Sequence, residues 1–308
     1  MDRKVDVIIP TYHPGKELFL LLDRLAEQTY PIHRIYIINT EQVYFETLIA
    51  GMDFGNVYPK VSIHHITKAE FDHGRTRDMG AKLSDADVLI FMTQDALPKN
   101  STLVEQLILP LQGQTAVSYA RQLPKKECNP IERYTRYFNY PKEERIKTRE
   151  NIGELGIKTF FCSNVCAAYQ RELYEKIGGF VSKTIFNEDM IFAANAVMKG
   201  YGIFYAAKAE VIHSHNYTLR EQFKRNFDLG VSQAEHPEIF KSISSESEGL
   251  KMVLKTTKFL WKKKKPVWIP YFFVQTVFKY SGYLLGKNYE KLPLWFILKC
   301  TMSKGYWK

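Results

Sequence analysis

The chain has 308 residues, of which 45% are hydrophobic and 25% are charged, a composition typical of globular rather than disordered proteins. Its formal charge of +10 favours anionic partners, and nucleic acid, anionic lipid and nucleotide phosphates all have that sign. No apolar run approaches the roughly 18 residues of a membrane-spanning helix, and the amino terminus lacks the apolar core of a signal peptide. We therefore expect neither an integral membrane bundle nor a secreted precursor.

The amino-terminal part of the chain alternates short apolar segments with stretches of helical spacing. Strands are predicted at 5–10, 34–40, 61–67 and 86–92, and the helices between them at 15–28 and 74–85. Strands separated by helical patterns are typical of βαβ units and a mostly parallel sheet. The pattern predicts an α/β fold of the nucleotide-binding type.

The next part of the chain has a different character. Residues 125–150 are polar, aromatic and basic, which indicates a surface loop. A strand is predicted at 158–170, a helix at 187–202 with Asn187 as its N-cap, and a strand at 201–215. The four cysteines are expected to be buried free thiols, because their spacing fits neither a zinc nor a redox motif, and this suits a reducing cytoplasm.

The sheet pattern stops near residue 240. A polar stretch at 242–249 reads as a linker, and the tail from 249 to 308 combines lysines with aromatic residues. Seven lysines (Lys251, Lys255, Lys258 and Lys262 to Lys265) precede Trp268, Tyr271, Phe272 and Phe273. Cations beside aromatic rings are typical of a helix that lies on an anionic membrane surface. The alternative is that the rings pack against the rest of the protein and the lysines form a solvated face.

Side chains able to bind a metal or a proton fall at predicted element ends. Asp95 follows the apolar strand at 86–92, Glu188 and Asp189 begin a helix, and His213 and His215 end a strand. Each has a structural alternative, such as a turn, a first-turn acid that offsets the helix dipole, or a hydrogen-bonded polar residue. Because the carboxyl ends of strands line the ligand crevice of α/β sheets, together they indicate a divalent-cation site and a general base.

In this order, the segments VDVIIPTYHPGKELFLLLDRLAEQTYP, ADVLIFMTQDALP, IGGF followed by Glu188-Asp189, and GYGIFYAAKAEVIHSH resemble family-2 inverting glycosyltransferases with the GT-A fold. Within that family, FDHGRTRDMGA, TQDALP and HSHNYTLREQFKRNFDLG look most like bacterial rhamnosyltransferases. The resemblance implies a nucleotide-diphospho-sugar-binding fold with a mostly parallel central sheet flanked by helices. It also implies a catalytic domain over 1–240, with a donor part at about 1–123 and an acceptor part at about 124–240. A helical extension would then cover 241–308.

The resemblance further implies roles for individual residues. Asp189 would be the general base with Glu188 beside it, and Asp95, His213 and, as second choice, His215 would hold Mn²⁺ or Mg²⁺ together with the donor diphosphate. The implied donor-binding residues are Pro10, Thr11, Tyr12, Asn39, Thr40, Glu41, Asp72, Arg75, Arg77, Gln94 and Asp95. One departure is that Thr93-Gln94-Asp95 replaces the family's Asp-X-Asp, so we expect weaker metal dependence.

The reaction implied is transfer of L-rhamnose from dTDP-β-L-rhamnose, with inversion, to a hydroxyl of a cell-surface polysaccharide or lipid-linked acceptor. UDP- and GDP-hexose donors remain open, and so does the oligomeric state. The expected location is the cytoplasm, peripheral on the inner face of the plasma membrane, with no nucleic acid partner.

Three other classes of protein fit the sequence less well. A nucleic-acid-binding protein would use the basic and aromatic residues of 133–137 and Lys262 to Lys265, but it leaves the acids and histidines at the strand ends unexplained. A nucleotidyltransferase usually needs a glycine-rich basic triphosphate loop, and the GKELFL segment is not one. An inactive relative is disfavoured by the presence of Asp95 and Asp189.

Overall fold

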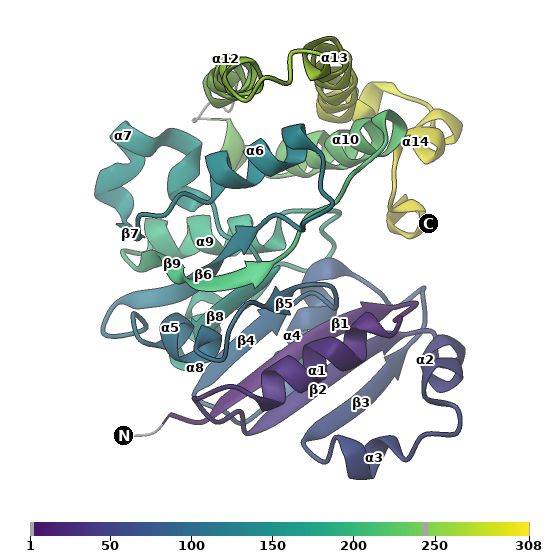
Figure 1. Cartoon of the computed structure of the whole chain (residues 1–308), viewed down its shortest axis with the longest axis vertical. Coiled ribbons are helices and arrows are strands. Elements are labelled where there is room, and N and C mark those ends of the chain that lie inside the picture. The colour runs from purple at the N-terminus through teal and green to yellow at the C-terminus, as the bar shows by residue number, and fades with distance from the viewer. Residues whose placement is uncertain (1–2, 242–245, 308) are drawn as a thin grey trace.

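The computed structural model describes residues 3–241 and 246–307. Within them a mixed sheet runs in the order β3-β2-β1-β4-β8-β6-β9-β5, with β7 also paired to β9 (Figure 1). The strands are Val5–Tyr12 (β1), Arg34–Thr40 (β2), Val61–Ile66 (β3), Val88–Met92 (β4), Leu97–Pro98 (β5), Thr115–Leu123 (β6), Arg145–Lys147 (β7), Cys166–Gln170 (β8) and Gly202–Ile212 (β9).

Helices cover both faces of the sheet and form a layer at one end of the molecule (Figure 1). The first of them are Glu17–Ala26 (α1), Gln42–Ile49 (α2), Phe54–Val57 (α3), His73–Leu83 (α4), Leu103–Ile108 (α5), Pro130–Asn139 (α6), Ile152–Leu155 (α7), Arg171–Ile177 (α8) and Glu188–Met198 (α9). The carboxyl-terminal ones are Leu219–Glu235 (α10), Pro237–Phe240 (α11), Glu246–Lys262 (α12), Trp268–Lys287 (α13) and Leu294–Cys300 (α14). Short 3₁₀ turns occur at Arg149–Asn151, Gly156–Phe160, Tyr289–Lys291 and Lys304–Trp307.

The predicted βαβ half of the fold is confirmed. Strands β3, β2, β1 and β4 are mutually parallel, and β8 joins β4 in the antiparallel sense. Alternate residues of β1 contribute to the core on opposite faces of the sheet. Val7 and Ile9 pack with the leucines of α1, whereas Ile8 packs on the other face. The buried strands therefore deliver their carboxyl ends, and the polar residues that follow them, to one edge.

Two predictions about the middle of the chain are wrong. Residues 125–150 are not a loop: they contain α6 and β7, and Ile131 of α6 is buried against Leu260 and Phe272 of the carboxyl-terminal helices. The strand predicted at 158–170 begins only at Cys166. Its first half includes part of the 3₁₀ turn Gly156–Phe160, and the backbone N–H of Asn164 donates to Asp189 of α9 rather than to a neighbouring strand.

The carboxyl-terminal region is helical, and α13 crosses α10 very closely. A Cβ at Gly282 or Gly286 would collide with backbone carbonyl oxygens of Phe223 and Phe227 in α10, so glycine is required at both positions. Of the predicted linker, residues 242–245 lie outside the described residues and the remainder begins α12. Among the described helices, none combines the length and hydropathy of a bilayer span. All four cysteines are free and buried, as predicted.

Candidate active site

Asp95, His213 and His215 converge at the ends of β4 and β9. The Oδ2 atom of Asp95 lies 3.0 Å from Nε2 of His215 and 3.4 Å from Nε2 of His213. The two Nε2 atoms are 3.0 Å apart. Three ligand atoms of the type that divalent transition metals prefer therefore face one point.

Gln122 of β6 orients one of these histidines. Its Oε1 lies 3.0 Å from Nδ1 of His213 and also accepts a hydrogen bond from Arg136. Because an amide oxygen can only accept, His213 carries its proton on Nδ1 and leaves the Nε2 lone pair for a metal. Burial lowers the pKa of His213 and so favours the neutral form that can bind a cation. The donor set and this tautomer fit a divalent ion. Nothing in the sequence marks Gln122 among the residues of a strand.

Electrostatics also favour the ionised form of Asp95. Burial by itself opposes its ionisation, but when the Nε2 atoms of His213 and His215 carry protons, their hydrogen bonds and charge outweigh burial and hold the pKa of Asp95 well below its usual range. Asp95 therefore presents a carboxylate to the same point as the two imidazoles.

Glu188 and Asp189 occupy the first turn of α9 but have different surroundings. Glu188 forms an ion pair with Arg77 at 3.1 Å, and both side chains are less than a tenth exposed (7% and 8%). Burial of Glu188 opposes its ionisation, but the Arg77 guanidinium and His73 outweigh burial and lower its pKa. Burial and the adjacent Glu188 carboxylate raise the pKa of Asp189 to about 7. The pair thus separates into a fixed carboxylate and one that exchanges a proton near neutral pH.

The segment from Ser163 to Val165 links these two clusters. The N–H of Asn164 donates to Asp189 (2.9 Å) and its side-chain amide donates to Glu188 (3.2 Å). Its neighbours bond to the metal side of the site: Ser163 Oγ accepts from Gln122 and the carbonyl of Val165 accepts from the N–H of Thr93. Asp189 therefore lies at the same edge of the sheet as Asp95. Sequence reasoning missed Asn164, which lies in an apolar run predicted as strand.

Asn187, predicted as the N-cap of α9, does not cap the helix through its side chain. It adopts a left-handed backbone conformation, with φ of 66°, and its amide donates to Ser232 of α10 at 3.1 Å. The residue before the acid pair therefore connects α9 to α10 instead.

The ends of β1 and β2 bring several predicted donor-binding residues together. Thr11 Oγ1 donates to Asn39 Oδ1 at 2.9 Å, and the Asn39 amide bonds to the carbonyl of Glu41 and to His65. Pro10 lies beside Ile38 in the register of these strands, and the hydroxyl of Thr40 is buried without a hydrogen-bond partner among the described residues.

An aromatic cluster lies next to these strand ends. The exposed ring of Tyr12 contacts the rings of His13 and Tyr44 edge-on, and the Lys68 ammonium lies 5.6 Å from the Tyr12 ring centroid. Sequence reasoning identified Tyr12 alone. His13 follows Tyr12 in the chain, so a second aromatic ring beside Tyr12 could have been predicted from the sequence.

Other predicted donor-binding residues make structural contacts. Gln94 accepts from the N–H of Tyr12 at 3.0 Å and donates to its carbonyl at 3.1 Å, which joins the loops after β4 and β1. Asp72 caps α4 by accepting from the N–H groups of Gly74 and Arg75. The Arg75 side chain donates to the carbonyl of Glu70. Arg77 is turned inward to Glu188 and does not lie on the helix surface.

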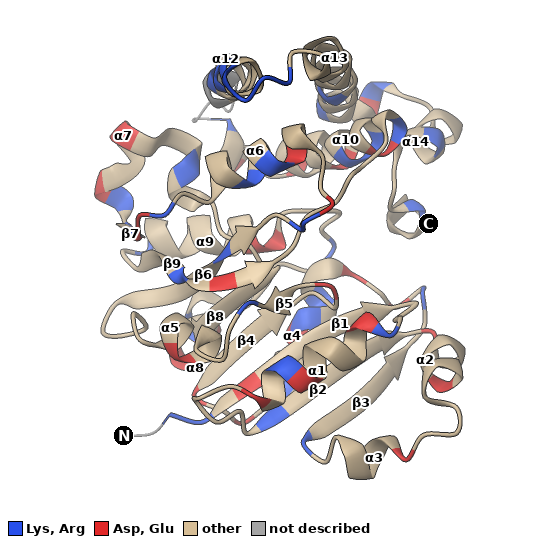
Figure 2. Ribbon diagram, in the orientation of Figure 1, with Lys and Arg blue, Asp and Glu red and all other residues tan. Residues whose placement is uncertain are grey.

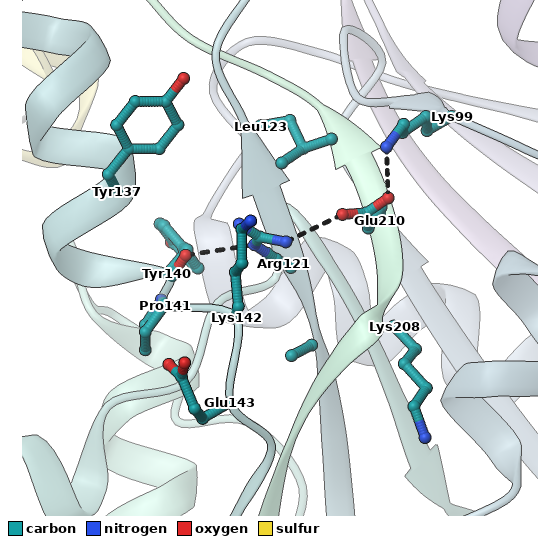
Figure 3. A pocket seen from close by; sticks show the side chains of 11 residues that line it. Lys99, Arg121, Leu123, Tyr137, Tyr140, Pro141, Lys142, Glu143, Lys208 and Glu210 are labelled. Carbon is teal, nitrogen blue, oxygen red and sulfur yellow. Dashed lines mark hydrogen bonds and ion pairs between the residues drawn. The ribbon is translucent and has the colours of Figure 1, made fainter.

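A wide groove of about 990 Å³ lies between the end of α6 and strands β6 and β9 (Figure 3). Figure 3 shows Glu210 between Lys99 and Arg121, and it forms ion pairs with them at 2.6 Å and 3.0 Å. None of the predicted site residues lines it. Arg121 and Leu123 alternate with Gln122 along β6, so the groove lies on the opposite face of that strand from the candidate metal site.

Comparison with known proteins gives concordant matches. Residues 6–178 match the family described as Glycosyl transferase family 2. The chain is 39% identical over 307 residues to the O-antigen chain rhamnosyltransferase RfbN of Salmonella typhimurium, covering 99% of this chain and 96% of that protein. It is 37% identical over 308 residues to the O-antigen chain rhamnosyltransferase WbaN of Salmonella anatum, covering 98% and 95%.

Solved structures match over most of the chain at low identity. The mannosyltransferase PcManGT from Pyrobaculum calidifontis, in complex with GDP-Man and Mn²⁺, superposes with a TM-score of 0.61 at 14% identity over 95% of this chain and 89% of that one. TarS 1–349 of S. aureus, in complex with UDP-GlcNAc, gives 0.50 at 13% identity over 94% and 91%. Together with the family match, this similarity confirms the predicted fold class.

Proposed function

The chain belongs to glycosyl transferase family 2, and on that premise we propose that it transfers L-rhamnose from dTDP-β-L-rhamnose, with inversion, to a hydroxyl of a cell-surface polysaccharide. The observation that carries the proposal is the near full-length similarity to two O-antigen chain rhamnosyltransferases. By similarity to these relatives, the proposed acceptor is a glycan of the O-antigen type.

Asp189 is the general base of the proposed reaction. An inverting transfer needs a carboxylate that removes the proton of the attacking hydroxyl as the new bond forms. A pKa of about 7 suits this task, since the group is then ionised in a useful fraction and still a competent base. Glu188 cannot serve equally well, because Arg77 and Asn164 already hold its carboxylate. Glu188 and Asn164 are therefore positioning residues.

Asp95, His213 and His215 are the proposed ligands of a divalent cation, Mn²⁺ or Mg²⁺. When bound, such an ion acts as a Lewis acid that neutralises charge on the leaving diphosphate. Gln122 keeps the Nε2 lone pair of His213 directed at that position. Two imidazoles in the donor set favour Mn²⁺ over Mg²⁺, because Mg²⁺ prefers oxygen ligands.

The ends of β1 and β2 are the proposed binding surface for the nucleoside. Tyr12, with His13 and Tyr44 against it, offers an exposed aromatic face to the base. The hydroxyl of Thr40 lies at the adjoining strand end without a partner among the described residues, and Asn39 holds that end through its bonds to Thr11 and Glu41. Gln94 bonds to Tyr12 of this surface and precedes Asp95 in the chain, so the residues proposed to bind the nucleoside and the cation are directly connected.

A panel of donors tests the proposal directly. Purified protein is incubated with Mn²⁺ or Mg²⁺ and dTDP-β-L-rhamnose, UDP-glucose, UDP-galactose or GDP-mannose, and release of the nucleoside diphosphate is measured. We expect turnover of dTDP-rhamnose and, with a glycan acceptor, an α-rhamnoside detectable by NMR. Efficient use of a UDP- or GDP-hexose without turnover of dTDP-rhamnose contradicts the proposed donor.

The same protein is proposed to work on the cytoplasmic face of the membrane, bound through α12, α13 and the loop between them. Figure 2 shows the lysines of this loop, Lys262 to Lys265, as a continuous basic segment at the edge of the molecule. Leu254, Trp261 and Val267 are exposed on either side of it. Cations with exposed apolar side chains are what a protein needs to sit at an anionic headgroup layer.

Vesicle co-sedimentation tests this membrane association. Native protein should pellet with phosphatidylglycerol vesicles at low salt and less at high salt, and substitution of Lys262 to Lys265 by Gln should reduce pelleting. The matched control removes four exposed lysines elsewhere, Lys60, Lys82, Lys99 and Lys176, and should pellet like native protein. Equal loss in both variants, or no pelleting of either protein, contradicts a specific role for the tail.

A further inference from the structure

A second, smaller hollow of about 310 Å³ lies where α10, α13 and α14 meet. Five side chains line it: Arg220, Phe223, Lys224, Phe278 and Lys299. Three are cations and two are phenyl rings, and no acid is among them. This hollow, the α10–α14 groove, is separate from the strand-end site and from the larger groove beside α6.

The three cations of the α10–α14 groove are not neutralised by a carboxylate of the described residues. Lys224 donates only to the backbone carbonyl of Thr301 at 3.3 Å, and Lys299 lies over the Trp295 ring at 5.0 Å. Arg220 is exposed in the first turn of α10. None of the three forms an ion pair with a carboxylate in the part of the chain that the structure describes. Three unpaired cations around one small hollow repel each other and favour an anion between them.

The walls of the groove show what kind of molecule carries that anion. Phe278 lines the groove and also belongs to an exposed apolar stripe of α13 that includes Val274 and Val277. On the other side, α14 exposes Leu294 and Trp295 one turn before Lys299. A free inorganic anion would gain nothing from these apolar surfaces, whereas a hydrocarbon chain attached to the anion would cover them.

The groove is rigid because its helices cannot shift independently. The close glycine contact of Gly282 with the backbone of Phe223 fixes α13 on α10 at the level of the groove. Thr301, which follows α14, donates to Asp228 of α10 at 2.6 Å and ties the third helix to the same frame. A preformed site of this kind binds its ligand without an ordering cost for the backbone.

We propose that the α10–α14 groove binds the phosphate group of a membrane lipid, with Arg220, Lys224 and Lys299 around the phosphate and Phe278 and Trp295 against the hydrocarbon chain. The inference rests on the proposed membrane association and gives it a specific lipid group. The basic loop at Lys262 to Lys265 supplies general attraction to an anionic surface, and the groove selects one phosphate from that surface. Arg220 is the second residue of α10, which begins at Leu219, so the groove lies five residues along the chain from His215, a proposed ligand of the cation.

A short-chain lipid tests the groove without a membrane and without transferase activity. The full chain is titrated calorimetrically with monomeric dihexanoyl phosphatidate, with inorganic phosphate, and with dihexanoylglycerol, which lacks the phosphate. We expect saturable binding of the phosphatidate, binding of inorganic phosphate at least tenfold weaker, and none of the neutral lipid. Replacing Arg220, Lys224 and Lys299 by Gln should weaken phosphatidate binding by roughly fivefold for each charge removed.

Two controls make the result decisive. Arg149→Gln, Lys287→Gln and Lys291→Gln together remove the same charge from exposed positions outside the groove and should leave phosphatidate binding unchanged. Lys224→Arg with Lys299→Arg keeps the charge and should retain binding. The proposal is overturned if phosphatidate does not bind, if both triple variants lose binding equally, or if inorganic phosphate binds as tightly as the lipid. Because no sugar donor is present, failure here leaves the proposed transferase reaction to its own test.

Discussion

The strand-end site and the carboxyl-terminal helices differ in whether their charged side chains have partners within the chain. At the strand ends, charged groups have partners within the chain: Arg77 pairs with the buried Glu188, the half-buried Asp95 contacts two histidines, and both acids of α9 accept hydrogen bonds from Asn164. In the carboxyl-terminal helices, Lys262 to Lys265 are exposed and form no ion pair with a described residue. The first region is organised around internal partners, and the second leaves its cations for a partner outside the chain.

This difference predicts how each region responds to substitution. A buried polar group that loses its partner retains the full cost of desolvation, so changes at the strand ends should affect stability as well as activity. An exposed lysine or leucine of the tail is solvated in the free folded protein as well as in the unfolded chain. Changes there should weaken binding and leave folding intact.

The largest expected effect is on catalysis and comes from Asp189→Asn. The variant keeps the size of the side chain but cannot remove the proton of the attacking hydroxyl, so kcat should fall by roughly 10²–10⁴-fold. Donor binding should stay near the native value. The raised pKa means that ionised Asp189 disfavours folding above pH 7, so the Tm of the variant at pH 8 should not fall. Near-native turnover by the folded variant would show that Asp189 is not the general base.

Arg77→Met should mainly destabilise the fold. It leaves the buried Glu188 carboxylate without its cation, which costs about 3–5 kcal/mol in comparable buried pairs. Urea unfolding measures the loss, and the double variant Arg77→Met with Glu188→Gln should recover most of it. A loss below about 1 kcal/mol would mean that water reaches Glu188.

Gln122→Leu probes the support of the cation site rather than its ligands. Without the amide oxygen, Nδ1 of His213 loses its acceptor, and metal affinity should fall by about 10–100-fold. Titration of the protein with Mn²⁺ measures the change, and Gln122→Glu, which keeps an acceptor, should retain most of the affinity. Unchanged affinity in Gln122→Leu would contradict the orienting role.

The pH profile of kcat should report Asp189. With a pKa of about 7 and the ionised form active, the rate should rise with pH and differ about tenfold between pH 6 and pH 8. Donor affinity measured at the same pH values serves as the control. An inflection near pH 4, the ordinary range of an aspartate, would show that the burial of Asp189 is relieved in the working enzyme.

The smallest effects are expected in the tail. Leu254 is 64% exposed, so Leu254→Ser should change the free energy of unfolding by no more than about 0.5 kcal/mol. Its loss should weaken vesicle binding by about tenfold, the lower end of what burial of a leucine contributes. Leu107→Ser, at a fully buried position, should show the reverse pattern by destabilising the fold. Equal effects of both changes on stability would contradict the claim that the tail contributes to binding and not to folding.

Local pattern was enough to predict much of this protein. The alternation of apolar strands and helical segments predicted β1 to β4 with α1 and α4. Strands β1, β2 and β4 are largely buried and therefore largely apolar, whereas β3 is only half-buried and carries two histidines. Asp95 after β4 and His213 and His215 after β9 could be predicted as site residues because polar groups that follow a buried strand emerge at the ligand edge, and Glu188 and Asp189 could be predicted at the start of a helix. Cysteine spacing likewise predicted the free thiols.

Tertiary structure decided which of these residues act on one another. Gln122 meets His213 across 91 residues of sequence, and Arg77 turns away from the helix surface to meet Glu188. Within 125–150, Asn129 and Pro130 are local signals for the start of α6, but the burial of Ile131 comes from Leu260 and Phe272 of α12 and α13. Hydrogen bonding, burial and pKa depend on neighbours brought together by folding, so no local pattern could separate a fixed Glu188 from a proton-accepting Asp189.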